Sequence, residues 1–469
     1  MSFMGKFNFW LLYFIKKVIY MKKRISHPVN LLCSILLCVA LMCSCPTPTF
    51  AATYEEWIEN WDTLKNDNSS VALMPGSDSS EMNFTWLSDI KDFAPKFELS
   101  EKQNMQAAQR IDVTSSLTVY GFKNTVSLKN LKSDTTYYYR ITKDKNWSEV
   151  YSFKTANDDN FNVLFISDAQ IGRSGDEKLD EVLQHDSLGW NNTLEAACSY
   201  EPDISLIVSA GDQVETAYTQ EQYNLFFAPD KLREIPVATA IGNHDFYFPL
   251  YSVRTANPNQ FERELLQCPA GKGYYFKRGE ALFIVINSNN FLTLDHEELI
   301  EEAMDFYPDA LWRIVVMHHS IYSRDEENNF SRPLFSAMFD KYNIDLVLSG
   351  HDHIYLRSCM LYDSQRVEEG GTVYLQANSA SGSNYDGAPS ELPWYAESCL
   401  QPRVPTYTIL NFTDGKISIS TLRSDTNEII DEYEMTKDKP TKTVVKDSII
   451  KKIYRQIADK IFEIKNSCK

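Results

Sequence analysis

The sequence predicts an all-β sandwich followed by an α/β domain, and three observations lead to this fold class. Between residues 54 and 157, short runs of β-branched and aromatic residues alternate with turn residues. From residue 160 onward, apolar runs alternate with stretches of helical periodicity, as in β-α-β units. Five of those apolar runs are followed by Asp, Asn or His, so the α/β domain is also where a functional site is expected.

Residues 1–52 have the pattern of an export signal region. Met21-Lys22-Lys23-Arg24 is a basic start, Leu31 to Met42 is an apolar core, and Ala51-Ala52 offers small residues for cleavage. A secreted or cell-surface location is therefore expected, with a retained N-terminal membrane anchor as the alternative. Such a location permits disulfides, and Cys359 with Cys399 is one candidate pair among the five cysteines that follow the signal.

Length and charge limit the possible functions. The 469 residues exceed one ordinary core, so two folded domains with appendages are expected. The net charge is −18, and residues 52–469 alone hold 64 acidic against 40 basic side chains, a net charge of −24. This balance argues against binding to nucleic acid, which needs clustered Lys and Arg. An acidic protein that handles anionic substrates needs a local cationic centre, and bound metal ions supply one.

The predicted β-sandwich covers residues 54–157. Its expected strands are Val71–Met74, Met82–Trp86, Thr125–Leu128, Thr135–Ile141 and Tyr151–Thr155. No cluster of acid–base residues accompanies them, so a structural module is the favoured interpretation.

The second domain, residues 160–436, carries the chemistry. Its expected helices are Thr193–Tyr200, Gln220–Phe227, Asp295–Asp305 and Pro333–Tyr342. Five apolar runs are expected strands, and each is followed by Asp, Asn or His. Val163–Ile166 is followed by Asp168, Ile204–Val208 by Asp212, and Ile235–Ile241 by Asn243 and His244. Ile314–Met317 is followed by His318 and His319, and Leu346–Leu348 by His351 and His353. Asp, Asn and His supply the oxygen and imidazole ligands of first-row metals. Five of the seven histidines after the signal lie in these motifs, which ordinary packing does not explain.

The stretch Gly242-Asn243-His244-Asp245 has a division of roles suggested by residue type. Asn243 offers a neutral oxygen ligand, His244 an acid–base group, and Asp245 a carboxylate that can orient that histidine. Alone the tetrapeptide is weak evidence, and the four other strand ends make it the centre of an expected metal site.

The order of these motifs resembles the calcineurin-like metallophosphoesterase superfamily. Leu128–Leu131, the Tyr-rich strand and Ser152–Thr155 resemble the fibronectin type III-like domain that precedes the catalytic domain in its purple acid phosphatase branch. The likeness covers roughly residues 54–434 and implies a four-layer α/β/β/α sandwich after the all-β domain. It also implies a site in which Asp212 bridges two metals. One metal is held by Asp168, Asp212 and His353, and the other by Asp212, Asn243, His318 and His351.

The resemblance also implies a reaction. A metal-activated hydroxide attacks a small phosphate ester, and unligated His244, oriented by Asp245, contacts the phosphate and protonates the leaving oxygen. The expected protein is an exported phosphomonoesterase of the acid-phosphatase type. A phosphodiesterase or nucleotide pyrophosphatase with the same site is the first alternative, and a cell-surface binding module with a vestigial metal site is the second.

Two residues depart from the family pattern. Purple acid phosphatases carry a tyrosine three residues after the bridging aspartate, where this chain has Glu215, so no ferric charge-transfer colour is expected. Gln170 stands where the superfamily has His or Gly, and its role stays open. The two metals are therefore expected to be iron, zinc or manganese, without a choice among them.

Residues 437–469 predict a basic amphipathic helix. Isoleucine-containing pairs recur every four residues from Ile449/Ile450 to Ile461/Phe462, with Lys and Arg between them. Packing against the acidic domain is the favoured role, and contact with an anionic membrane or cell-surface polymer is the alternative.

Overall fold

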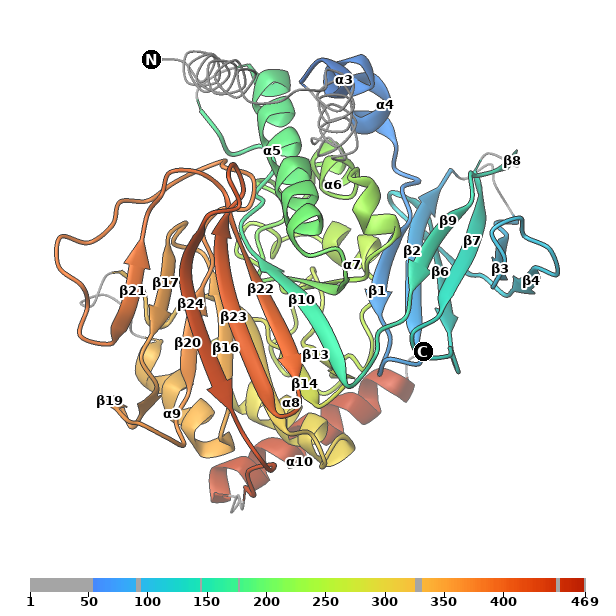
Figure 1. Ribbon diagram of the computed structural model, residues 1–469. Helices are drawn as coiled ribbons and strands as arrows, with labels where there is room; N and C mark the ends of the chain where they lie inside the picture. Colours follow the sequence, from blue (N-terminus) through green and yellow to red (C-terminus); the bar gives the residue numbers. More distant parts are fainter. Residues whose placement is uncertain are drawn as a thin grey trace, which may run out of the picture. The chain divides into compact units, whose positions relative to one another are not determined.

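The computed structural model describes residues 54–89, 94–143, 146–175, 178–324, 331–443 and 448–467 (Figure 1). The predicted export signal at residues 1–52 lies outside them, as does Cys468. Ala51–Lys469 form one compact unit. Among the described helices none is long and apolar enough to cross a bilayer.

The N-terminal part of the described chain begins with helices, which corrects the prediction of β structure from residue 54. Helices α3 (Tyr54–Glu59) and α4 (Trp61–Asn66) bury Trp57 and Trp61 in the core of the larger domain. The indole nitrogen of Trp57 donates to Ser187 Oγ at 3.0 Å. Both tryptophans therefore pack on the larger domain and do not belong to a strand of the all-β domain.

The all-β domain follows as two sheets packed on an aromatic core. One sheet has the order β1 (Ala72–Pro75), β2 (Met82–Ser88), β6 (Gly121–Leu128), β5 (Thr114–Thr118), and the other has the order β4 (Gln109–Ile111), β3 (Phe97–Ser100), β7 (Thr136–Lys143), β8 (Asn146–Trp147), with β9 (Tyr151–Lys154) also paired to β7. The Phe84 ring lies 4.9 Å from Phe97 and 5.0 Å from Tyr139 between the sheets. The predicted strands are confirmed, and the Tyr-rich strand supplies core residues.

The larger domain is built on two further sheets. The first has the order β12 (Val237–Thr239), β11 (Ile204–Ser209), β10 (Asn160–Ile166), β22 (Thr406–Thr413), β23 (Lys416–Arg423), β24 (Ile429–Thr436). The second has the order β13 (Tyr274–Arg278), β14 (Ala281–Val285), β15 (Trp312–His319), β16 (Leu346–Gly350), β20 (Val373–Gln376), β17 (Tyr355–Ser358), β21 (Ala396–Leu400). The five predicted ligand-bearing strands are thus divided between two sheets.

Side-chain alternation along the strands creates the four layers. Val163 and Phe165 of β10 face the core between the sheets, whereas Leu164 and Ile166 face helices α5 (Leu179–Tyr200) and α6 (Gln220–Phe226). On the second sheet, alternate residues of β15 face helices α8 (Thr293–Phe306) and α9 (Arg332–Tyr342). The order helix, sheet, sheet, helix confirms the predicted α/β/β/α sandwich (Figure 1).

The remaining elements are short connections and the C-terminal helix. They are η1 (Asp230–Arg233), α7 (Leu250–Arg254), β18 (Leu361–Tyr362), β19 (Gln365–Arg366) and α10 (Ile449–Ser467). Helix α10 packs against α8, as favoured from its basic pattern, because Arg455 Nε lies 2.8 Å from both carboxylate oxygens of Glu298. Cys359 and Cys399 are free thiols, so the candidate disulfide between them is wrong.

Candidate metal centre

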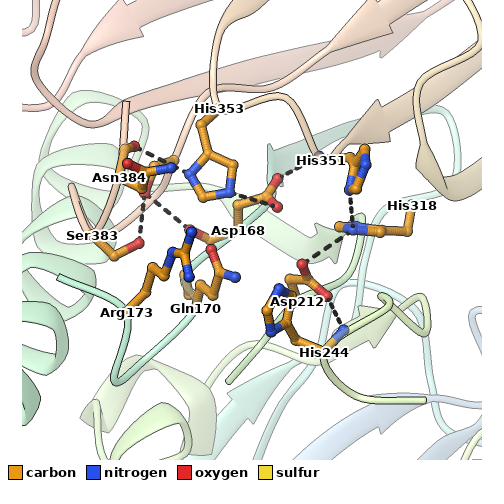
Figure 2. A network of polar contacts seen from close by, with 12 residues as sticks. Asp168, Gln170, Arg173, Asp212, His244, His318, His351, His353, Ser383 and Asn384 are labelled. Carbon is orange, nitrogen blue, oxygen red and sulfur yellow. Dashed lines mark hydrogen bonds and ion pairs between the residues drawn. The ribbon is translucent and has the colours of Figure 1, made fainter. Parts of the chain in front are cut away.

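The ends of five strands and the loops that follow them bring the predicted ligand side chains together. Figure 2 shows Asp168, Asp212, His318, His351 and His353 pointing toward one another. The first sheet supplies one group from the ends of β10, β11 and β12, and the second sheet supplies the other from the ends of β15 and β16. The first group is Asp168, Asp212 and Asn243, and the second is His318, His351 and His353. A direct link between the two sheets runs from the His351 backbone N–H to Asp168 Oδ2, at 2.9 Å.

The tightest part of the site surrounds His318 Nε2. This atom lies 2.9 Å from Asn243 Oδ1, 3.2 Å from Asp212 Oδ2 and 3.2 Å from His351 Nδ1. His318 Nδ1 is committed to the carbonyl oxygen of Ala210 at 3.0 Å, so the lone pair of a neutral His318 points into the cluster. When His351 Nδ1 is also unprotonated, two oxygens and two imidazole nitrogens converge there, an arrangement that fits a cation.

The charges within this cluster respond to one another. Burial opposes ionisation of Asp212, but the adjacent His318 lowers the pKa of that carboxyl well below its usual range. Burial lowers and Asp212 raises the pKa of His318, and the net effect is an increase to about 9. A proton on His318 thus supplies the positive charge that the carboxylate requires, and a metal ion binding there competes with that proton.

A second set of donor atoms lies around Asp168. This carboxylate is fully buried, and its Oδ1 accepts no hydrogen bond from the described residues. His353 Nε2 is 3.4 Å from that oxygen, while His353 Nδ1 donates to the carbonyl oxygen of Asn384 at 3.2 Å. A buried carboxylate oxygen without a donor is costly unless a cation contacts it, so these two residues also fit a metal.

The ligands depend on unusual backbone geometry. Asp168, Asp212, His351 and His353 have φ angles of 52°, 50°, 81° and 48°, in the left-handed region that residues with a Cβ rarely adopt. Gly242 allows the loops to approach closely, because a Cβ there would lie 2.0 Å from Asp212 Oδ1. The site is therefore shaped by its loops before any ligand arrives.

His244 is held without being part of either donor set. Its backbone N–H donates to Asp212 Oδ1 at 2.8 Å, and its ring Nδ1 lies 2.9 Å from the carbonyl oxygen of Glu215. The Glu215 carboxylate is 3.3 Å from the same Nδ1, and the His244 side chain is 28% exposed. Nδ1 is thereby occupied, so Nε2 is the ring nitrogen available for proton transfer.

Asp245 does not orient His244, which corrects the sequence prediction. Its carboxylate is fully buried and accepts hydrogen bonds from Tyr223 Oη at 2.9 Å, Gly242 N at 3.0 Å and Gln213 N at 3.4 Å. Burial and the nearby Asp212 raise the pKa of Asp245 to about 7. Asp245 therefore fixes the turn that carries His244, while Glu215 contacts the imidazole itself.

Glu215 also gathers two residues from the loop after β10. Gln170 Nε2 donates to Glu215 Oε2 at 2.9 Å, and Arg173 Nη1 donates to Glu215 Oε1 at 3.2 Å. The loop is anchored from helix α5, where Asp186 Oδ2 accepts the backbone N–H groups of residues 172, 173 and 174. The sequence marked Glu215 only by its spacing from Asp212, and nothing in it marked Arg173 or Asp186.

Comparison with known families bears on both domains. The family model of calcineurin-like phosphoesterases matches residues 161–355, and the model of the purple acid phosphatase N-terminal domain matches residues 68–155. The chain has a calcineurin-like phosphoesterase domain after a purple acid phosphatase N-terminal domain. The family resemblance is thus confirmed, while the domain limits given from the sequence remain predictions.

Individual relatives agree with this membership. The chain is 23% identical over 367 residues to "Probable inactive purple acid phosphatase 24" of Arabidopsis thaliana, an alignment covering 68% of this chain and 58% of that protein. It thus spans less than two thirds of that relative's length. The purple acid phosphatase PPD1 from yellow lupin (Lupinus luteus) seeds shares 16% identity at a TM-score of 0.65, over 81% of this chain and 78% of the lupin chain. PhoD shares 11% identity at a TM-score of 0.56, over 86% of this chain and 99% of PhoD.

The two matched families have a common chemistry in outline. Calcineurin-like phosphoesterases act on phosphate esters, and purple acid phosphatases use dinuclear metal centres. In this chain, Asp212, His318 and His351 form a group whose ligand atoms are close enough to hold one metal ion.

Proposed function

We propose that this phosphoesterase is an exported hydrolase of small phosphate monoesters that uses two metal ions. One ion would be held by Asp168, Asp212 and His353, and the other by Asp212, Asn243, His318 and His351. The observation that carries the proposal is the convergence of Asn243, Asp212 and His351 donor atoms at 2.9–3.2 Å from His318 Nε2. Iron, zinc and manganese all accept such oxygen and nitrogen ligands.

The metal ions, when bound, supply positive charge for the phosphate oxygens and lower the pKa of a water molecule. The rest of the mechanism belongs to the chain. Glu215 fixes His244 Nδ1 through its carbonyl oxygen and its carboxylate, at 2.9 and 3.3 Å. A doubly protonated His244 can then release its Nε2 proton to the leaving oxygen while Nδ1 stays bonded. Glu215 is the positioning residue of this step, in the role first expected for Asp245.

The proposal is tested by metal analysis of the purified chain together with turnover of a matched pair of substrates, a phosphate monoester and a diester of the same alcohol. Two equivalents of metal and faster monoester hydrolysis are expected. Asp212→Ala should lose both metals, because the proposal assigns its carboxylate to both ions. Two retained equivalents in that variant would contradict the bridging assignment, and faster diester turnover would favour a phosphodiesterase.

A binding module with a vestigial centre is the second candidate. The Arabidopsis thaliana relative has the word "inactive" in its name, and that observation is the reason to keep this candidate. It predicts a chain that folds normally and hydrolyses neither ester with iron, zinc or manganese supplied. Export rests on residues 21–52 alone, and the mass of the chain recovered outside the expressing cell tests it.

A further inference from the structure

Gln170 is a buried glutamine whose amide is hydrogen-bonded at its nitrogen only. The residue is 2% exposed, and its Nε2 donates to Glu215 Oε2 at 2.9 Å. Its Oε1 is also buried, and it accepts no hydrogen bond from the described residues. An amide oxygen left unpartnered inside a protein costs about 1–3 kcal/mol. Such an oxygen therefore calls for a partner from outside the polypeptide, either a water molecule or a cation.

The contact with Glu215 sets the direction of that oxygen. An ionised carboxylate accepts hydrogen bonds and donates none, so the amide nitrogen must face Glu215 and the amide oxygen must face away from it. Glu215 itself lies against the imidazole of His244. Figure 2 shows the Gln170 amide between Asp168 and His244, with its oxygen on the side of Asp168. The unpartnered oxygen is thus directed into the group of predicted ligands.

The backbone holds Gln170 at this place under strain. Its N–H donates to the carbonyl oxygen of Asp212 at 2.8 Å, and it lies two residues after Asp168 in the same loop. Its φ angle is 36°, in the left-handed region that is unfavourable for a glutamine. A strained residue that is also buried and polar points to a functional demand on its side chain.

The neighbours of the amide oxygen distinguish it from a mere packing defect. A buried oxygen without a donor is no site by itself, and Gln376 has one too among the described residues. Beside Gln170, however, Asp168 Oδ1 is a second buried oxygen without a donor, and His353 Nε2 lies 3.4 Å from it. A carboxylate, an amide carbonyl and an imidazole are all ligands that divalent first-row metals accept.

We propose that Gln170 Oε1 is a further ligand of the metal ion assigned to the donor set of Asp168 and His353. Glu215 is the positioning residue of this ligand, because its carboxylate fixes which way the amide points. The inference rests on the two-metal assignment of the proposed function, but not on the hydrolysis of any ester. It gives Glu215 two partners to orient, the imidazole of His244 and the amide of Gln170.

The test measures metal affinity directly, without turnover. The zinc-loaded full chain is titrated with a chelator of known affinity, and the zinc that remains bound is counted by elemental analysis. Gln170→Leu should weaken one of two equivalents by about tenfold or more and leave the other unchanged. Glu215→Ala should weaken the same equivalent, because the amide is then free to turn. Gln170→Glu restores an oxygen ligand, so it should retain zinc more tightly than Gln170→Leu.

Asn124→Leu is the matched control. Asn124 is a fully buried amide on strand β6 of the all-β domain, and its Nδ2 donates to Ser88 Oγ at 2.9 Å. The variant loses a buried amide as Gln170→Leu does, but at a place remote from the donor set in sequence. It should keep both zinc equivalents at wild-type affinity, and circular dichroism melting compares the destabilisation of the two variants.

Unchanged affinity of both equivalents in Gln170→Leu would overturn the proposal. The opposite order, with Gln170→Glu losing zinc more readily than Gln170→Leu, would overturn it as well. That order is expected if the amide serves only as a donor to Glu215, because two carboxylates would then face each other without a cation. A wild-type chain that binds fewer than two equivalents would refute both this ligand and the two-metal centre. A chain that shows the expected affinities yet hydrolyses neither ester would refute the hydrolase alone.

Discussion

Substituting Gly242 with alanine should disable the centre while leaving all its ligands in the sequence. A Cβ on residue 242 would lie 2.0 Å from Asp212 Oδ1 and 2.3 Å from Asp212 N, whereas real Cβ atoms essentially never approach within 3.0 Å. The carboxylate or its backbone must therefore move by about 1 Å, and metal–ligand distances tolerate only about 0.2 Å. The Asp212 backbone cannot yield freely, because its carbonyl oxygen accepts Gln170 N at 2.8 Å.

A displacement of about 1 Å at a catalytic group lowers turnover by roughly 100-fold, and overpacking of this kind lowers the free energy of unfolding by about 1–3 kcal/mol. The assay measures bound metal and monoester turnover in Gly242→Ala and in Gly387→Ala. The second variant is the control, since the nearest atom to its new Cβ is Arg324 Nη1 at 3.9 Å. Turnover and metal content within twofold of the wild type in Gly242→Ala would refute the reasoning.

Three further predictions follow from the described contacts. His244→Ala should keep its metals, because the backbone N–H of residue 244 still reaches the Asp212 carboxylate. Its turnover of esters with poor leaving groups should fall by about 100-fold or more. Equal loss with good and poor leaving groups would argue against proton donation. Lys451→Met should lower the free energy of unfolding by about 1–3 kcal/mol in urea titration, because Glu297 and Glu301 lose the hydrogen bonds of a buried ammonium and keep only Lys341 and Arg455 as cationic partners. Exposed Lys452→Met should lower it by less than about 0.5 kcal/mol. Burial raises the pKa of Glu264 from 4.5 to about 8, so its stabilising contribution is full below pH 4.5 and is lost as pH rises through 8. The melting temperature should therefore fall between those pH values in the wild type and fall less in Glu264→Gln, with Glu368→Gln behaving as the wild type.

The ligand positions could be predicted because buried strands leave a recognisable apolar run in the sequence. A strand covered on both faces is an unbroken apolar run, as in Val163–Ile166, and the first acidic residue beyond it stands out. The same logic located Asp212 and His318. The division of the strands between two sheets was not predictable, because an apolar run does not record which sheet it joins.

Side-chain direction was the second limit. Asp245 directly follows His244 in the chain, yet it turns away to Tyr223, which lies on helix α6. Helix α5 begins at Leu179 and not at Thr193, and Gly189 in its middle obscures the periodicity. That glycine is required by a partner far along the chain, since a Cβ there would lie 2.0 Å from the carbonyl oxygen of Ser381.

The left-handed backbone at Asp168, Asp212, His351 and His353 bears on the history of the chain as well as its chemistry. Each such residue costs about 1–2 kcal/mol relative to an ordinary conformation, so the four together consume several kcal/mol of fold stability. Glycine or asparagine relieves that cost at any of the four positions. In a chain that is no longer selected for turnover, such replacements stabilise the fold at no functional loss. This chain has an aspartate or a histidine at all four strained positions, as a working centre requires.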